Sequence, residues 1–175
     1  AARGRLLHAL FERLPATRPE DRRRGAFAWL QQSAGVTDAA LRTWLVDSAL
    51  TIIEAPEHAE LFSPAALAEA PIAATLPDGT VVAGTVDRLL VTDEVVRVVD
   101  FKTGRQVPRG PEAIPPGHRR QMQAYGRALQ VIFPRHRIDL ALLYTEAPLM
   151  LSVPLEDLTG ATHMGATPNQ EQPTS

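Results

Sequence analysis

The amino-acid sequence predicts one domain of the α/β class with elements in α+β order, in which an antiparallel three-stranded meander follows an N-terminal helical segment. Apolar residues recur at helical spacing through residues 1–62. From residue 69 onward, apolar residues form short runs separated by turn signals, as in antiparallel strands. The chain has 175 residues, of which 45% are apolar and 22% charged, so it is long enough to bury its own core.

Three helices are expected in the N-terminal helical part. Asp38 is expected to cap the third, because a carboxylate accepts hydrogen bonds from the free amides at a helix N-terminus. The expected helices span Ala2–Leu14, Glu20–Gln32 and the residues from Asp38 to Ile53, and Pro56–Phe62 forms a short helical turn.

Three consecutive strands are expected to form an antiparallel meander. Pro77-Asp78-Gly79 is a strong turn signal between the first two. Gly84, inside the second, indicates a bulge or a close backbone approach. The expected strands are Glu69–Leu76, Thr80–Thr92 and Val95–Lys102.

A loop with four prolines, a helix and two further strands complete the expected core. These elements are expected at Arg119–Phe133, Asp139–Thr145 and Leu149–Val153. Residues 159–175 are small and polar without an apolar period, which is typical of a disordered tail. We therefore expect a single domain over residues 1–158, with its helical part at 1–62 and its core at 69–155.

The second and third strands carry aspartates where apolar residues are expected. Asp87 lies in the second strand, and Asp100 lies two residues before Lys102 in the third. Because side chains alternate between the faces of a strand, Asp100 and Lys102 share one face, about 7 Å apart. Lys102 is the only lysine among 18 basic residues. A lone lysine in this position indicates a chemical role for an ammonium group.

A two-residue loop at Asp93-Glu94 would place Asp87 opposite Asp100. Facing carboxylates repel each other, and partial burial strengthens the repulsion unless a cation lies between them. The pattern therefore indicates a site for a hard divalent metal ion with an ammonium group beside it. The register is inferred, because Asp-Glu is a poor sequence for a tight hairpin turn. The alternative is a half-exposed hairpin with ordinary surface charges.

Charge is strongly segregated, although the net charge is only −2. Residues 38–100 carry three arginines against 11 acidic residues, and residues 102–137 carry eight basic residues against one acidic residue. A basic segment directly after an acidic site suits a polyanion bound across that site. A solvated arginine-rich loop and helix would give the same pattern.

The sequence also excludes several kinds of site. It has no cysteine, which excludes disulfides and cysteine-ligated zinc or iron–sulfur sites and fits a reducing compartment. It has no GxxxxGK[ST], HExxH or GxSxG motif. No apolar run approaches the roughly 18 residues of a membrane span, so no membrane partner is expected.

Five short segments resemble, in the same order, the motifs of the nuclease domain of the RecB/AddA family, which has the PD-(D/E)xK fold. They are RGRLLH near the start, EAPI in the first strand, GTVDRLL in the second, VVDFKTGR in the third and QMQAY in the following helix. LLYTEAP near the end resembles AddA in particular. The resemblance covers most of the chain and implies a restriction-endonuclease-like core, in which helices flank a central mixed β-sheet.

The resemblance also implies a role for each residue of the acidic site. His8, Asp87 and Asp100, with the backbone carbonyl of Phe101, would bind the metal ion. Asp87, Asp100 and Lys102 would be the catalytic residues. Taken without the resemblance, His8 beside an apolar helix face would more often be a packed histidine.

Further residues would support or contact the nucleic acid. Gln121 and Tyr125 match the helix motif on the DNA side, although the apolar neighbours of Tyr125 also suit core packing. Glu69 matches a family position with a less defined role. The candidates for phosphate contacts are Arg105, Arg109, Arg119 and Arg120.

The implied activity is that of a Mg²⁺-dependent deoxyribonuclease in which Mn²⁺ can substitute. The metal ion would polarise the scissile phosphate and lower the pKa of a water molecule, which Lys102 would orient. AddB relatives hold an iron–sulfur cluster with four cysteines. The lack of cysteine here favours AddA and predicts no cluster.

The resemblance implies the C-terminal exonuclease domain of a longer AddA-type helicase–nuclease that acts in double-strand break repair and recombination. The implied partners are single-stranded or unwound DNA, the helicase domains of the same chain and an AddB-type subunit, at the nucleoid in the bacterial cytoplasm. Two alternatives stay open. One is a catalytically silent nuclease-fold module that binds DNA or docks a subunit, and the other is a metal-free interaction domain with a chance motif.

Overall fold

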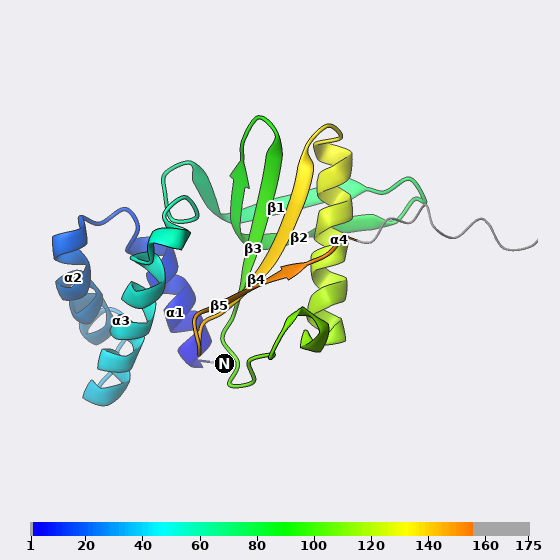
Figure 1. Cartoon of the computed structure of the whole chain (residues 1–175). Helices are drawn as coiled ribbons and strands as arrows, with labels where there is room; N and C mark the ends of the chain where they lie inside the picture. The colour runs from blue at the N-terminus through cyan, green and yellow to red at the C-terminus, as the bar shows by residue number, and fades with distance from the viewer. Residues whose placement is uncertain (1, 156–175) are drawn as a thin grey trace, which may run out of the picture.

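The computed structural model describes residues 2–155, which form a helical part beside a five-stranded sheet (Figure 1). The helical part contains α1 (Ala2–Arg13), α2 (Pro19–Gln32), α3 (Ala39–Ile53) and the 3-10 turn η1 (Pro56–His58). The remaining elements are β1 (Ala66–Thr75), β2 (Val81–Val91), β3 (Val95–Lys102), the 3-10 turn η2 (Pro111–Ala113), α4 (Pro116–Ile132), β4 (Arg137–Tyr144) and β5 (Leu149–Val153). The expected order of helices and strands is confirmed.

The helical part is built around α3, on which both α1 and α2 pack. α1 buries Leu7 and Phe11, which lie four residues apart on one side of the helix. Asp38 caps α3 as predicted, because its Oδ1 accepts hydrogen bonds from the amides of Ala40 and Leu41 at 2.9 and 3.2 Å.

The sheet has the strand order β1-β2-β3-β4-β5. β3 and β4 run parallel, whereas the other neighbouring strands are antiparallel. A parallel pair needs a long crossover connection, which residues 103–136 supply and which contains α4. The predicted mixed sheet with an antiparallel three-stranded meander is therefore confirmed.

β2 and β3 pair in the predicted register, in which Arg88 faces Val99. The loop between them is the two-residue Asp93-Glu94. This sequence suits a tight turn poorly, but the Thr92 hydroxyl compensates by accepting the amide of Val95 at 3.1 Å. The last pair of this ladder is Arg88 and Val99. One residue further in the same register, Asp87 would face Asp100.

Different helices cover the two faces of the sheet (Figure 1). The helical part packs on one face, where Val99, Phe101 and Leu143 join its core. α4 packs on the other face against apolar residues from all five strands. β3 is therefore covered on both faces, so that Asp100 is buried and Lys102 is half-buried at the end of the strand.

The pairing of β1 with β2 is interrupted at one position. Glu69 would face Asp87, but the two residues do not pair, and the same register resumes on either side. Glu69 has a φ of 48°, a left-handed conformation that costs a non-glycine residue about 1 kcal/mol or more. The strand is thus distorted at the position where its acidic side chain meets β2.

Gly84 marks a close approach of a side chain, and the pairing contains no bulge at this position. A Cβ atom at Gly84 would lie 2.5 Å from the Tyr125 hydroxyl and 2.7 Å from its ring carbon Cε1. Glycine is therefore required at this point of β2 for α4 to pack against the sheet.

The predicted boundaries differ from the structure mainly where elements begin. α4 starts at Pro116, three residues before the predicted start, because proline is tolerated in the first helical turn, where its missing amide is not needed. β1 and β4 also start earlier than predicted, at Ala66 and Arg137. The tail expected at 159–175 lies outside the described residues. Within residues 2–155, no helix combines the length and apolar character needed to cross a bilayer.

Candidate active site

Lys102 and Asp100 lie at the end of β3, on the face that α4 covers. Lys102 Nζ donates a hydrogen bond to Asp100 Oδ2 at 2.7 Å, and only 16% and 10% of the two side chains are exposed. Lys102 Nζ also donates to Gln121 Oε1 on α4 at 3.1 Å. Because an ammonium group has three donors, one remains for another partner.

The side chain of Asp87 accepts a backbone hydrogen bond just beyond the last residue pair of the ladder between β2 and β3. Its Oδ2 accepts the backbone amide of Phe101 at 2.5 Å, and its side chain is only 11% exposed. Burial alone would raise the pKa of Asp87. Hydrogen bonds from His8 and from the Phe101 amide outweigh burial, so the net pKa is lowered and the carboxylate is ionised.

The pKa of Asp100 is shifted in the opposite direction. Burial, and next the negative charge of Asp87, raise the pKa of Asp100 to about 6, although Lys102 opposes the shift. Two neighbouring carboxylates with pKa values moved apart are typical of a site built for a cation.

His8 reaches this cluster from α1, as the resemblance implied. Its Nδ1 lies 3.2 Å from Asp87 Oδ1, and its ring packs edge-on against Phe101 at a centroid distance of 5.6 Å. The hydrogen bond with Asp87 raises the pKa of His8, although burial opposes it. In the metal-free protein, the proton on His8 therefore occupies the position beside Asp87 where a cation would be favoured.

Glu69 contributes more to the cluster than the sequence suggested. One ligand atom from each of His8, Glu69 and Asp87 lies within 4.8 Å of the other two. Burial and the charge of Asp87 raise the pKa of Glu69. Asp100 stands outside this three-residue group and is instead bonded to Lys102. The carbonyl of Phe101 keeps its implied role as a prediction, because only the amide and ring of that residue have defined contacts.

These side chains fit a divalent metal ion. Glu69, Asp87 and His8 offer two carboxylates and one imidazole to a single ion, and Asp100 adds a third carboxylate beside Asp87. Mg²⁺ and Mn²⁺ prefer oxygen-rich sets of this kind. A hollow of about 400 Å³ opens beside them and is lined by Arg5, Glu12 and Thr103 together with His8 and Glu69. His8 and Glu69 are thus accessible from the side of α1.

Gln121 and Tyr125 support the site from α4. Gln121 joins Lys102 to Tyr125, because its Nε2 donates to the Tyr125 hydroxyl at 3.4 Å. Tyr125 is only 8% exposed and packs over Gly84. The ring of Tyr125 belongs to the core, and its hydroxyl ends a chain of polar contacts that leads to Lys102. Its position on the DNA side stays a prediction.

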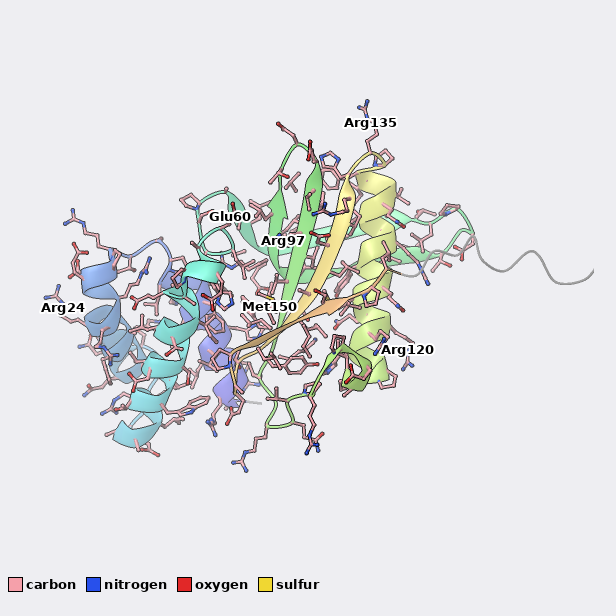
Figure 2. The ribbon with its side chains drawn as sticks, viewed as in Figure 1. Arg24, Glu60, Arg97, Arg120, Arg135 and Met150 are labelled. Carbon is pink, nitrogen blue, oxygen red and sulfur yellow. The ribbon has the colours of Figure 1, made fainter. Side chains whose placement is uncertain are left out.

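The four candidate arginines differ in their surroundings. Arg105 and Arg109 are exposed in the loop after β3, and Arg120 is exposed on the outer side of α4 (Figure 2). Arg119 instead donates to the carbonyls of Pro111 and Glu112 at 2.7 and 3.5 Å. Arg119 thus holds the loop before α4, and the other three remain the better candidates for phosphate contacts.

Sequence reasoning missed a second polar contact on the α4 side, between His118 and Tyr144. His118 Nδ1 lies 3.3 Å from the Tyr144 hydroxyl. The spacing contained a signal for it, since His118 is one helical turn before Gln121. The pairing of Tyr144 with Lys102 across β3 and β4 could not be read without knowing that these strands are parallel neighbours.

Three comparisons with known proteins were made, and one of them identifies a family. The model of the PD-(D/E)XK nuclease superfamily matches residues 1–170. Among solved structures, one described as "Crystal structure of SSO0001" is 16% identical to this chain, with a TM-score of 0.38. The match covers 83% of this chain but 65% of that one. A comparison with curated proteins found no match. The mixed sheet flanked by helices is consistent with a restriction-endonuclease-like core, and the chain belongs to the PD-(D/E)XK nuclease superfamily.

Proposed function

We propose that this chain is a metal-dependent DNA nuclease domain that hydrolyses phosphodiester bonds. The observation that carries the proposal is the convergence of His8, Glu69 and Asp87 beside the Asp100–Lys102 pair. A nuclease superfamily model that matches residues 1–170 supports it. The exposed arginines of α4 and of the loop after β3 suit a polyanionic substrate.

Mg²⁺, with Mn²⁺ as a substitute, is the proposed cofactor. His8, Asp87 and Asp100 would hold it with the carbonyl of Phe101, and Glu69 is positioned to join them. When bound, such a cation polarises a phosphate oxygen and lowers the pKa of a water molecule. Its binding requires His8 to lose the proton that it shares with Asp87.

Lys102 is the proposed catalytic lysine. Asp100 and Gln121 hold its ammonium group by two hydrogen bonds, which leaves the third N–H free to donate to a water molecule or a phosphate oxygen. A compact ammonium can serve both carboxylate and substrate at this point, whereas the planar guanidinium of arginine would need more space. Gln121 is in turn held by Tyr125, so the lysine is fixed from two sides.

The wider context of the domain is also a proposal. The motif LLYTEAP and the absence of cysteine support an AddA-type exonuclease domain, without an iron–sulfur cluster, at the C-terminus of a helicase–nuclease. Such a protein would act on single-stranded or unwound DNA in double-strand break repair and recombination. Its helicase domains and an AddB-type subunit would be partners, at the nucleoid in the bacterial cytoplasm.

Cleavage assays with two lysine variants test the function. We expect the purified chain to degrade linear or single-stranded DNA with Mg²⁺ or Mn²⁺ and to stop when EDTA is added. Lys102→Ala should lower the cleavage rate by about a hundredfold or more, since groups that stabilise developing charge contribute at least that much. Lys102→Arg should not restore the rate, because a retained positive charge alone does not reproduce the ammonium.

Different results would point to other functions. Equal cleavage by the Lys102→Ala protein would refute the role given to Lys102. DNA binding without cleavage, in both the isolated chain and its natural complex, would support a catalytically silent module.

A further inference from the structure

Tyr144, near the end of β4, has a buried hydroxyl with one partner among the described residues. Only 1% of Tyr144 is exposed, and its hydroxyl lies 3.3 Å from Nδ1 of His118. Burial raises the pKa of Tyr144 above its ordinary value, so the phenol keeps its proton. A buried donor needs an acceptor, and His118 Nδ1 supplies it.

This contact favours the tautomer of His118 that carries its proton on Nε2, because the Tyr144 phenol needs an acceptor and His118 is its one partner among the described residues. A neutral imidazole that accepts at Nδ1 has its hydrogen on Nε2. Burial, and next the positive charge of Lys102, lower the pKa of His118 and favour the neutral ring. Within residues 2–155, Nε2 has no hydrogen-bond partner. His118 thus presents a single neutral N–H donor.

The donor lies on the α4 side of the candidate active site. His118 precedes Gln121 by one helical turn, so the two side chains occupy the same side of α4. Gln121 bonds to Lys102, and Tyr144 is the register neighbour of Lys102 across β3 and β4. Gln121 and Tyr144, the two residues that lie next to His118, therefore both border the proposed catalytic lysine.

We propose that His118 is a substrate-positioning residue, which donates its Nε2–H to a phosphate oxygen of the bound DNA strand next to the phosphate at Lys102. Tyr144 would act through His118 by holding it in the required tautomer. The inference rests on the proposed nuclease function and adds a binding residue on the α4 side, opposite the one from which His8 approaches.

A neutral donor suits this place better than a further cation. Lys102 is already paired with Asp100 at 2.7 Å, and another positive charge nearby would compete for the carboxylates that the metal site requires. A neutral N–H can bond to a phosphate oxygen without forming an ion pair inside the cluster. It would fix the position of the strand while leaving the charge balance of the site unchanged.

Equilibrium binding of a fluorescent single-stranded oligonucleotide tests the proposal separately from cleavage. The Lys102→Ala protein with Mg²⁺ provides the background, and His118→Ala and His118→Gln are added to it. His118→Ala should weaken binding about tenfold or more, because it removes a hydrogen bond to a charged group. His118→Gln should restore most of the affinity, since its amide nitrogen can reach the position of Nε2.

The salt dependence of binding distinguishes a neutral donor from a cation. Loss of one cationic phosphate contact reduces the slope of log K against log salt by about 0.7 for single strands. His118→Ala should leave the slope unchanged, and Arg120→Ala serves as the cationic comparison. His136→Ala is the matched control, because His136 contacts the Thr92 carbonyl at the opposite end of β4 and should not affect DNA binding.

Nitrogen NMR of the imidazole rings tests the part assigned to Tyr144. His118 should show a protonated Nε2 and a bare Nδ1 in the parent chain, and a mixture of tautomers in the Tyr144→Phe protein. Unchanged affinity in His118→Ala, no rescue by His118→Gln, a reduced salt slope or a protonated Nδ1 in the parent chain would each overturn the proposal.

The proposed function and the role of His118 can fail independently. A chain that cleaves DNA but binds it equally well without His118 refutes only the role of His118. A chain that binds DNA through His118 but never cleaves it refutes only the nuclease function. A chain that does not bind DNA refutes both.

Discussion

Asp100 interacts with the positive charge of Lys102 and with the negative charge of Asp87. Lys102 donates to its Oδ2, whereas Asp87 and burial together raise its pKa from 3.8 to about 6. An acid whose pKa is raised in the folded state destabilises the fold once it ionises. The penalty is absent below pH 3.8, grows as the pH rises to 6 and is complete above it.

Asp100→Asn should therefore stabilise the metal-free protein at pH 8 and not at pH 4. The shift corresponds to about 3 kcal/mol at most, which predicts a melting temperature higher by several degrees at pH 8. Thermal unfolding in EDTA at both pH values measures the effect. Asp139→Asn is the control, because its exposed pair with Arg137 predicts no gain at either pH. Equal or lower stability of Asp100→Asn at pH 8 would contradict this explanation.

Glu69 shows what could not be read from single residues. Its position opposite Asp87 depends on the register between β1 and β2, and its left-handed backbone is unrelated to its side-chain type. Asp87 and Asp100 were predictable because their spacing and the alternation of strand side chains are local properties. His8 was identified only through its resemblance to a family motif, since no local pattern connects α1 to β2.

At the scale of elements, the register of the β2–β3 hairpin and the bounds of β3 were predicted to the residue, although the turn sequence is unfavourable. β2 is one residue shorter at each end than predicted. The turn works because the Thr92 hydroxyl accepts the amide of Val95. The start of α4 was predicted too late, because two consecutive prolines were interpreted as loop residues. Helix and strand patterns are local, whereas the tolerance of a helix start for proline depends on which amides need partners.

Gly84→Ala should weaken both the fold and the site. The added Cβ would lie 2.5 Å from the Tyr125 hydroxyl, so the ring and its bond to Gln121 must shift. Overpacking of this kind costs about 1–3 kcal/mol. We expect a lower free energy of unfolding in urea and slower DNA cleavage.

Gly25→Ala is the matched control for this substitution. A Cβ atom at Gly25, inside α2, would meet nothing within 4 Å. The change should stabilise the protein by about 0.5–1 kcal/mol, because alanine favours helix more than glycine does. Similar effects of the two substitutions would show that the contact with Tyr125 is unimportant.

At the scale of the whole molecule, the site joins the two parts of the domain. His8 comes from the helical part, whereas Glu69, Asp87 and Asp100 come from the sheet. Arg88 ties the same two parts together, because its buried guanidinium donates to the carbonyl of Phe11 on α1. The sequence alone could not show that His8 lies beside these carboxylates, because a contact between residues so far apart in the chain depends on how the core packs.

Mn²⁺ should stabilise the helical part and the sheet together, and more strongly at pH 8 than at pH 5.5. A ligand at 100 times its dissociation constant adds about 2.7 kcal/mol of stability. Protons compete for His8 and Asp100, whose pKa values are both raised, so the metal ion binds less tightly at the lower pH.

Melting temperature and amide hydrogen exchange measure this effect. Protection should increase in α1 as well as in β3, and Asp87→Asn should abolish both changes. An absent shift with millimolar Mn²⁺ would favour the metal-free interaction domain. Protection of β3 alone would exclude His8 from the metal site.

The parallel pairing of β3 with β4 also determines the order in which the site can form. The β2–β3 hairpin closes across two residues, and hairpins form within about 1–10 μs. The contact between the Lys102 carbonyl and Thr145 joins residues 43 positions apart, and longer loops cost more entropy to close. We therefore expect Asp87 and Asp100, which lie on one hairpin, to come together early in folding. His8 on α1 and Gln121 on α4 are distant in sequence from this hairpin, so we expect them to join the site later, with the slower long-range contacts.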